Sequence, residues 1–573
     1  MAINNNGHYV KMPHNWCRID VLLGSLCINV LGLALPIIIL QIYDRIVPNA
    51  AMETFALLMI GMAIVVIADA ALRILRSLIL SWSGAKFEHL ESVRSITQIL
   101  QGDTLEFESR SSGTYLEKIS NLEKIREFFS GQAMLTLLDL PFVIVFAWLI
   151  WFITGPLVLV PVTLLALYSG ISLYAANRMR HLMQSRSDLD ERRQNFMIET
   201  LRGIHTVKST AIEPLILRRY ERLQGQSAES VDDISRISGI NQGLAAILAN
   251  VGTVSFVGIG SLFVVTNEIT LGALAAGTML TGRVIQPLLR AMGLWYQFQS
   301  VRIARNQLDE LFEMKTESAY AANEVPTDWG RIELSDIRFS YPNVEEELLR
   351  GVSLSVQPGE TIGITGGNGT GKSTLLSIIM GLFTPSDGRV QIDGRDIRGI
   401  EPEMLRSRIG YVPQKGVIYE GSILENMTLF REGEAIRNAI ALANLLGLTE
   451  LIAKLPAGLD TPIGGTAVDS LPEGLRQKII IVRALVTDPD ILLFDDANAN
   501  FDLINDSRLL KVIKSFKGHL SIVIVTHRPS YLKICDRCFE LQDGVLTTHV
   551  PFGASAPPPQ STAAPKVSEG LAS

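Results

Sequence analysis

The first half of the chain alternates between long apolar and long polar stretches. Six of the apolar stretches contain about 20 residues or more, the length that a helix needs to cross a bilayer core about 30 Å thick. They are Val21–Tyr43, Thr54–Leu80, Met134–Ile153, Pro156–Ala176, Gly243–Val265 and Leu271–Trp295. The pattern therefore predicts six transmembrane helices. Arg283 and Arg290 interrupt the last one; we expect Arg283 to face a cavity and Arg290 to reach the membrane boundary.

Two long polar segments, Ser81–Ala133 and Asn177–Gln242, join the second span to the third and the fourth to the fifth. Both are rich in Lys, Arg and Glu at helical spacing, and their basic content places them on the cytoplasmic side. The spans are thus predicted to continue as helices into the cytoplasm.

The second half has a different pattern, in which strand-like runs alternate with helical ones from Arg331 to Val550. This alternation is typical of an α/β nucleotide-binding sheet. The predicted organisation is a polar N-terminal segment (1–15), a membrane domain (16–315), a linker (316–330), a nucleotide-binding domain (331–550) and a disordered tail (551–573) rich in Ala, Pro and Ser.

Composition agrees with a membrane protein. The 573 residues are 47% hydrophobic and 19% charged, and the mean hydropathy of +0.27 is high for a soluble protein of this size. The net charge of −7 gives no support to a nucleic-acid partner. The N-terminus lacks the pattern of a signal peptide.

Four cysteines, at positions 17, 27, 535 and 538, do not suggest a disulfide framework, because two belong to an apolar region and two to the nucleotide-binding half. Cys535-x-x-Cys538 could be a redox or metal pair. It has no second pair or His cluster nearby, so we favour a packing role.

A glycine-rich segment stands between a strand-like run (Thr361–Thr365) and a helical one (Thr374–Met380). It reads Gly366-Gly367-Asn368-Gly369-Thr370-Gly371-Lys372-Ser373. Such glycines let consecutive backbone N–H groups surround a polyphosphate, and the helix that follows adds its positive N-terminal end. Lys372 can reach the β- and γ-phosphates and Ser373 can bind Mg²⁺, so the segment predicts a nucleoside triphosphate site.

Other residues fit the same site. Asp495 ends an apolar strand and suits Mg²⁺ binding through water, and Asp496 follows where a base or water-positioning group would stand. Tyr341 precedes the phosphate loop at a distance that suits stacking on adenine. Gln414 and His527 supply further polar groups. Each of these last three alone would more often be structural, but their order around the phosphate loop favours an ATP site.

Taken together, Arg331–Val550 resembles the nucleotide-binding domain of an ABC transporter, and the six spans resemble the membrane half of a type I ABC exporter. The resemblance implies a six-span α-helical domain joined to an α/β P-loop domain, with ATP and Mg²⁺ as cofactors. It implies these roles: adenine stacking by Tyr341; phosphate binding by Gly366–Ser373 and Thr374; Mg²⁺ binding by Ser373, Gln414 and Asp495; and catalysis by Asp496, Gln414 and the switch histidine His527. Asp502 matches the D-loop aspartate. Such half-transporters dimerise, and each ATP lies between one chain's phosphate loop and the other's signature loop.

Two membrane-domain stretches, Leu40–Asn49 and Leu137–Phe142, look like signatures of type I protein-secretion exporters, and Phe107–Phe129 and Gly203–Lys208 look like their coupling regions. This resemblance implies a multi-pass protein of the bacterial inner membrane with a cytoplasmic nucleotide-binding domain. It implies a secreted polypeptide as cargo, and membrane lipids, a periplasmic adaptor and an outer-membrane channel as partners. Only fifteen polar residues precede the first span, as in the shorter, protease-type exporters.

The chain departs from the family at the signature, at Asp496, and in the stretch Thr461–Gly465, which lacks the glutamate usual at its fifth position. The signature Leu-Ser-Gly-Gly-Gln is replaced by Leu471-Pro472-Glu473-Gly474-Leu475. Pro472 has no hydroxyl and no N–H, and Glu473 would repel each phosphate charge by about 3 kcal/mol at about 5 Å and an effective dielectric constant near 20. A helix should still start there, with proline early and an acid in its first turn.

The second departure is Asp496, which stands where the family has glutamate and is shorter by one methylene. We therefore expect good ATP binding and slow hydrolysis, with a heterodimer favoured over a homodimer. Two alternatives remain: an exporter of a lipid, glycan or small peptide, and a regulatory ATP-binding subunit that hardly hydrolyses ATP.

Overall fold

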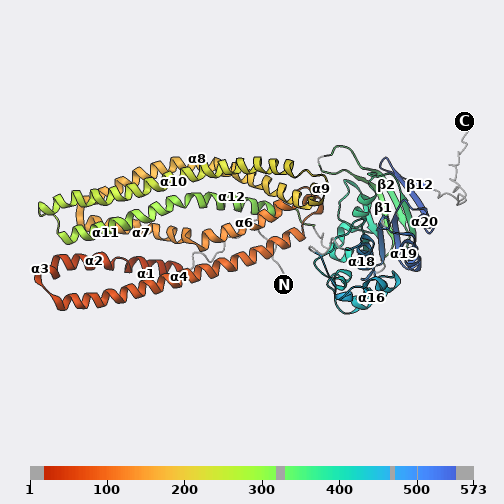
Figure 1. Ribbon diagram of the computed structural model, residues 1–573, viewed down its shortest axis with the longest axis horizontal. Coiled ribbons are helices and arrows are strands. Elements are labelled where there is room, and N and C mark those ends of the chain that lie inside the picture. The colour runs from red at the N-terminus through yellow and green to blue at the C-terminus, as the bar shows by residue number, and fades with distance from the viewer. Residues whose placement is uncertain (1–18, 318–328, 343, 465–470, 500, 550–573) are drawn as a thin grey trace, which may run out of the picture. The chain divides into compact units, whose positions relative to one another are not determined.

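The structure is a computed structural model that describes residues 19–317, 329–342, 344–464, 471–499 and 501–549 (Figure 1). The predicted N-terminal segment, most of the linker and the C-terminal tail lie outside these residues. The chain divides into two compact units, one built mainly from residues up to Thr316 and the other from Glu317 onward. Each unit is described separately.

The first unit is helical. Its helices are α1 (Ile19–Leu31), α2 (Ala34–Gln41), α3 (Val47–Asn49), α4 (Met52–Leu100), α5 (Thr104–Glu108), α6 (Ser112–Ser130), α7 (Gln132–Thr154), α8 (Leu159–Arg202), α9 (Ile204–Ser209), α10 (Glu213–Val265), α11 (Leu271–Gly293) and α12 (Trp295–Phe312). A π-helical turn (η1, Ile42–Ile46) and a 3₁₀ turn (η2, Gly155–Val158) interrupt the series. Figure 1 shows the long helices running side by side, and α8 packs along α10, α11 along α7 and α12 along α6.

Four described helical stretches are long and apolar enough to cross a membrane: Ile19–Asn49, Met52–Leu100, Gly113–Ala175 and Glu213–Val265. The third contains the third predicted span and all but the last residue of the fourth. The sixth predicted span is a helix, α11, but it is not among the four, so the count of six stays a prediction. The polar segments continue the spans as helix, as expected: α4 runs on to Leu100 and α8 to Arg202.

Large apolar side chains stay exposed along these helices, for example Leu57, Ile67 and Phe152 at 72%, 69% and 73%. A water-soluble protein rarely exposes so much contiguous apolar surface, whereas a lipid-facing helix does. Inside the unit, buried apolar residues such as Ile150, Phe256 and Leu280 form the core between the helices.

Both secretion-type signatures of the membrane domain have a structural role. Asp44 of η1 accepts hydrogen bonds from Thr270 Oγ1 at 2.6 Å and from the backbone N of Gly272 at 2.9 Å, and so caps the start of α11. Asp139 of α7 accepts one from Asn29 Nδ2 at 3.0 Å and lies 3.4 Å from Arg76 Nη1. The two aspartates thus join helices that are far apart in sequence.

The two arginines of α11 differ. Arg290 is exposed, as expected for a residue near a boundary. The guanidinium of Arg283 lies at the break between α1 and α2, where a Cβ on Gly32 would be only 2.4 Å from Arg283 Nη1. Arg283 therefore packs against Gly32, and that it faces a cavity stays a prediction.

The second unit is an α/β domain with two main sheets. A six-stranded sheet has the order β12 (Val545–His549), β11 (Arg537–Gln542), β3 (Thr361–Thr365), β10 (Ser521–Val525), β9 (Ile491–Asp495) and β6 (Ile409–Val412). A four-stranded antiparallel sheet has the order β2 (Leu349–Val356), β1 (Ile332–Phe339), β4 (Asp387–Ile392) and β5 (Arg395–Asp396). Two short strands, β7 (Gly421–Ser422) and β8 (Pro462–Ile463), pair with each other.

The helices of this unit are α13 (Lys372–Ile379), α14 (Pro402–Ser407), α15 (Ile423–Thr428), α16 (Glu434–Leu445), α17 (Thr449–Ile452), α18 (Glu473–Leu485), α19 (Leu503–Phe516) and α20 (Pro529–Leu532), with 3₁₀ turns η3 (Ile397–Gly399) and η4 (Gly458–Asp460). Every residue of β9 and β10 is buried, as expected for parallel strands covered on both faces. Because β3, β10, β9 and β6 are adjacent and parallel, their carboxyl ends lie at one edge of the sheet.

Candidate functional site

The phosphate loop has the predicted form of strand, glycine-rich loop and helix. It connects β3 to α13, which begins at Lys372, two residues before the predicted start. Gly369 and Gly371 have φ values of 80° and 98°, a conformation that favours glycine. A Cβ on Gly366 would lie 2.3 Å from the carbonyl oxygen of Leu541. The glycines are therefore needed both for the turn and for the close approach of β11.

Lys372 lies over this loop. Its Nζ donates to the carbonyl oxygens of Gly366 at 2.7 Å and Gly367 at 2.6 Å. Burial lowers the pKa of Lys372, and the nearby carboxylates of Asp495 and Asp496 oppose that shift. The ammonium group thus stands beside the loop amides, where a phosphate group would meet it.

Asp495 ends β9 and is 5% exposed. Burial raises its pKa, and hydrogen bonds from the hydroxyl groups of Ser373 and Tyr411 act in the opposite direction. The Tyr411 hydroxyl lies 3.4 Å from Asp495 Oδ2. A hydroxyl of α13 and a buried carboxylate of β9 therefore face each other, and oxygen ligands of these kinds are what Mg²⁺ takes in phosphate sites.

Asp496 is half-buried and lies just past the end of β9 in a left-handed backbone conformation, with φ at 43°. Its backbone N donates to the carbonyl oxygen of Val525 at 2.8 Å, and Thr526 Oγ1 lies 3.5 Å from its Oδ1. Aspartate tolerates this backbone better than most residues. The carboxylate is therefore anchored to the end of the neighbouring strand, β10.

Tyr341 follows β1, and its ring packs edge-on against Phe339 and Phe383 at centroid distances of 5.1 and 6.0 Å. Its hydroxyl lies 3.0 Å from Thr374 Oγ1 in α13. These contacts fix the ring beside the phosphate-loop helix, while 37% of the residue stays exposed. An exposed, immobilised aromatic ring suits base stacking.

Gln414 and His527 are both exposed, each two residues beyond a strand of the sheet, β6 and β10 respectively. The strand order places both at the edge that also carries the phosphate loop, Asp495 and Asp496. The sequence alone could not show this, because strand order is a long-range property.

The signature segment forms the start of α18. Pro472 is the N-cap residue, and its carbonyl oxygen accepts from the backbone N of Leu475 at 2.9 Å and of Arg476 at 3.1 Å. The expectation that a helix persists here is confirmed. The side chain of Glu473 pairs with Arg476 at 3.3 Å, a contact that the prediction overlooked although the i, i+3 spacing signalled it.

Further positioning contacts carried no sequence signal. Gln477 of α18 donates to the carbonyl oxygen of Pro413, next to Gln414, at 3.1 Å. Arg483 donates to the carbonyl oxygens of Val417 at 2.6 Å and Asn426 at 2.9 Å. The signature helix is therefore bonded to the segment that contains Gln414.

Cys535 and Cys538 lie beside the sheet, and their packing role stays a prediction. Their Sγ atoms donate to the carbonyl oxygens of Tyr531 at 3.2 Å and Leu532 at 3.4 Å, and both thiols lie near Gly363 in the central strand. Within the described part of the chain, no group of three or more His, Cys, Asp and Glu side chains is placed to hold a metal ion.

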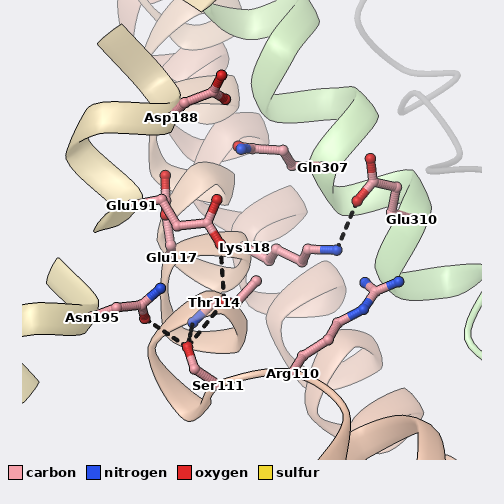
Figure 2. A pocket seen from close by; sticks show the side chains of 10 residues that line it. All are labelled: Arg110, Ser111, Thr114, Glu117, Lys118, Asp188, Glu191, Asn195, Gln307 and Glu310. Atoms are coloured by element: carbon pink, nitrogen blue, oxygen red, sulfur yellow. Dashed lines mark hydrogen bonds and ion pairs between the residues drawn. The ribbon is translucent and has the colours of Figure 1, made fainter. Parts of the chain in front are cut away.

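The membrane unit has a polar cavity of about 560 Å³ between α6, α8 and α12 (Figure 2). Lys118 pairs there with Glu310 at 2.9 Å, and Thr114 Oγ1 donates to Glu191 at 3.0 Å. Its lining is entirely polar or charged: Arg110, Ser111, Thr114, Glu117, Lys118, Asp188, Glu191, Asn195, Gln307 and Glu310. No pattern in the sequence indicated this cavity.

Comparisons with known proteins agree with this architecture. Residues 349–499 match the family described as ABC transporter, and residues 19–288 match the ABC transporter transmembrane region. The chain is 32% identical to the cyclolysin secretion/processing ATP-binding protein of Bordetella pertussis over 528 residues, which are 92% of this chain and 74% of the relative. It is 30% identical to the alpha-hemolysin translocation ATP-binding protein of Escherichia coli O157:H7 over 531 residues, 92% of this chain and 75% of that protein.

A solved structure, a bacterial Atm1-family ABC exporter with ATP bound, is similar with a TM-score of 0.82 and 23% identity, covering 92% of this chain and 94% of that one. The likeness shows that the two chains share a fold.

Proposed function

Because the chain belongs to the ABC transporter family, with the membrane region and the ATP-binding domain in one polypeptide, we propose that it is a half-transporter that drives export of a polypeptide across the bacterial inner membrane. Its ATP-binding domain makes it a transport-coupled ATPase. The observation that carries the choice of cargo is the similarity, over 92% of the chain, to two proteins named for cyclolysin secretion/processing and for alpha-hemolysin translocation.

The chain's own residues account for ATP binding. Lys372 would exchange its two carbonyl acceptors for phosphate oxygens, and the amides of the glycine-rich loop and of the first turn of α13 would hold the same phosphates. Ser373 and Asp495 would hold Mg²⁺, which neutralises phosphate charge when bound. Tyr341 would stack on the base. Asp496 would orient the attacking water, and His527 lies at the same sheet edge.

Hydrolysis in this proposal is slow. Pro472 removes a hydroxyl and an N–H from the signature segment, and Asp496 is one methylene shorter than the family's glutamate. In a heterodimer with an intact half-transporter, each of the two ATP sites would inherit one of these defects. We favour the site that contains Asp496 for residual hydrolysis, because its phosphate contacts from this chain are complete. A periplasmic adaptor and an outer-membrane channel complete the proposed assembly.

The test is secretion in the host bacterium. Polypeptides in the medium are compared between cells that carry the wild-type chain and cells that carry Lys372→Ala, which removes the phosphate contact. We expect one or a few polypeptides to disappear from the medium and accumulate in the cytoplasm. Unchanged extracellular polypeptides together with altered envelope lipids or glycans would contradict polypeptide export and favour the alternative cargo.

A regulatory ATP-binding subunit is the second candidate, and the combination of Pro472, Glu473 and Asp496 favours it. Vesicles that contain the chain with its partner separate the two functions. Transport that continues with a non-hydrolysable ATP analogue would support regulation, whereas strict dependence on hydrolysis supports the half-transporter.

A further inference from the structure

Arg528 follows His527 directly, and its side chain makes three polar contacts to other segments of the chain. Its Nη1 pairs with Asp506 of α19 at 2.9 Å. Its Nη2 donates to the carbonyl oxygens of Ala499 at 3.1 Å and Phe501 at 3.4 Å. One guanidinium group therefore bonds the residue after His527 to the segment after Asp496, of which residues 497–499 form a turn and residues 501 and 502 precede α19.

Asp506 is the centre of this arrangement. It is 9% exposed, and its Oδ1 also accepts from Asn498 Nδ2 at 3.0 Å and from the hydroxyl of the fully buried Tyr531 at 3.1 Å. These three donors come from two segments of the chain: Asn498 lies after β9, whereas Arg528 caps α20 and Tyr531 lies within it. If the guanidinium were removed, Asp506 would still accept hydrogen bonds from two neutral donors, Asn498 and Tyr531. The carbonyl groups of Ala499 and Phe501 would lose the hydrogen bonds that Arg528 donates to them.

The turn and the histidine segment begin at adjacent strands. Asp495 of β9 pairs in register with Val525 of β10, and the backbone N of Arg528 also donates to Thr526 Oγ1 at 3.2 Å. The backbone bond from Asp496 N to the carbonyl oxygen of Val525 at 2.8 Å extends this pairing by one residue, and His527 lies two residues beyond β10. Beyond that bond, the guanidinium of Arg528 links the two segments of the chain by side-chain hydrogen bonds.

We propose that Arg528 is a positioning residue for ATP hydrolysis, which fixes Ala499 and Phe501 and the His527 segment relative to each other. The proposal rests on the ATPase activity that the proposed function includes. The physical reason is geometric: a misplacement of about 1 Å between reacting groups can lower turnover about a hundredfold. The loop that holds the phosphates makes none of these contacts, so nucleotide affinity should not depend on Arg528.

The experiment compares Arg528→Met, Arg528→Lys and Tyr531→Phe in the full chain in nanodiscs. Tyr531→Phe is the matched control, because it removes a hydrogen bond from the same carboxylate but leaves the contacts to Ala499 and Phe501. We expect Arg528→Met to lower kcat about tenfold to a hundredfold, with KM and the Kd for ATP changed by less than about twofold. Arg528→Lys should recover part of the loss, and Tyr531→Phe should keep kcat within about twofold while lowering Tm.

A purely structural network gives a different result. If kcat falls in Tyr531→Phe as much as in Arg528→Met, in proportion to Tm, the positioning role is wrong. It is also wrong if Arg528→Met keeps kcat within twofold of the wild type.

Amide hydrogen exchange of the nucleotide-free protein decides the matter if turnover is too slow to compare. The proposal requires faster exchange at residues 497–499 and 501 in Arg528→Met but not in Tyr531→Phe, with the phosphate loop unchanged in both. Equal exchange in the two variants would overturn it. A wild-type chain that fails to bind ATP would contradict the proposed function instead, and the exchange result would still stand.

Discussion

Lengthening the side chain of residue 496 should raise ATP turnover. Asp496→Glu moves the carboxylate outward by about 1.5 Å, while the backbone bond from Asp496 to Val525 at 2.8 Å holds the chain in place. Because a displacement of about 1 Å can change the rate about a hundredfold, we expect kcat to rise tenfold to a hundredfold, equivalent to about 1.4 to 2.7 kcal/mol in activation free energy.

The same substitution should cost stability, since residue 496 has a φ of 43° and glutamate tolerates the left-handed region less well than aspartate. We expect a loss of about 1 kcal/mol. Asp488→Glu is the matched control. Asp488 is exposed, has a φ of 53° and lies before β9, at the end opposite Asp496. It should lose similar stability without any change in kcat.

The assay is steady-state hydrolysis of Mg·ATP by the purified chain in nanodiscs, beside thermal unfolding, with Lys372→Ala as the inactive reference. Asp496→Asn should fall to the level of that reference. The reasoning is refuted if Asp496→Asn turns over as fast as the wild type, because the measured activity then does not use this carboxylate. It is also refuted if Asp496→Glu binds ATP normally and gains no activity.

Three other substitutions test the structure outside this carboxylate. Burial raises the pKa of Asp495, so this carboxyl group binds its proton more tightly in the folded protein than in the unfolded chain. The contribution of this group to the free energy of unfolding therefore falls as the pH rises from the ordinary pKa of aspartate to the raised pKa. Asp495→Asn should therefore raise Tm at pH 7 without nucleotide and abolish Mg²⁺-dependent turnover; a lower Tm would contradict this sign. Asn426→Leu should lower the free energy of unfolding of the nucleotide-binding unit by about 3 kcal/mol, because Asn426 is fully buried and bonds both the backbone N and the backbone O of Tyr419 at 2.8 Å. Denaturant titration measures this loss, and a loss below about 1 kcal/mol would show that water replaces the amide. Asp44→Ala should destabilise α11 by about 1 kcal/mol through loss of the cap on Gly272, whereas Asp44→Asn should retain part of it in thermal unfolding; equal Tm values for the wild type and Asp44→Ala would exclude a capping role.

Local sequence patterns predicted the local parts of the site. The apolar run before Gly366 and the helical run after Lys372 made the strand, loop and helix predictable, because phosphate loops follow from glycine geometry and helix ends. The start of α18 at Glu473 was predictable for the same kind of reason, since proline and an acidic residue suit a first turn. Each prediction depended on residues within about one helical turn of one another.

Contacts between distant segments were not predictable. Arg528, Arg483 and Gln477 each bond to backbone carbonyls of another segment, and a carbonyl acceptor leaves no trace in the sequence of its partner. The aspartates Asp44 and Asp139 were noticed only as parts of a family resemblance; the structure adds that they bond across helices. In the membrane unit, hydropathy located the helices, but the interrupted α11 falls outside the spans that length and composition identify.

The contact between Glu473 and Arg476 lowers the energetic cost that the altered signature segment would have, and brings it close to the cost of Asp496 in place of glutamate. Considered alone, Glu473 would repel a phosphate charge by about 3 kcal/mol. Arg476 lies 3.3 Å from that carboxylate, and its positive charge, together with the positive end of the α18 dipole, offsets most of the repulsion. What remains is the hydrogen bonding that Pro472 cannot provide, worth about 2 kcal/mol for a donor to a charged group. This is close to the estimate of up to 2.7 kcal/mol for the shortened carboxylate of Asp496. In the proposed heterodimer, two defects of this size would slow the ATPase about thirtyfold to a hundredfold at either site rather than inactivate it.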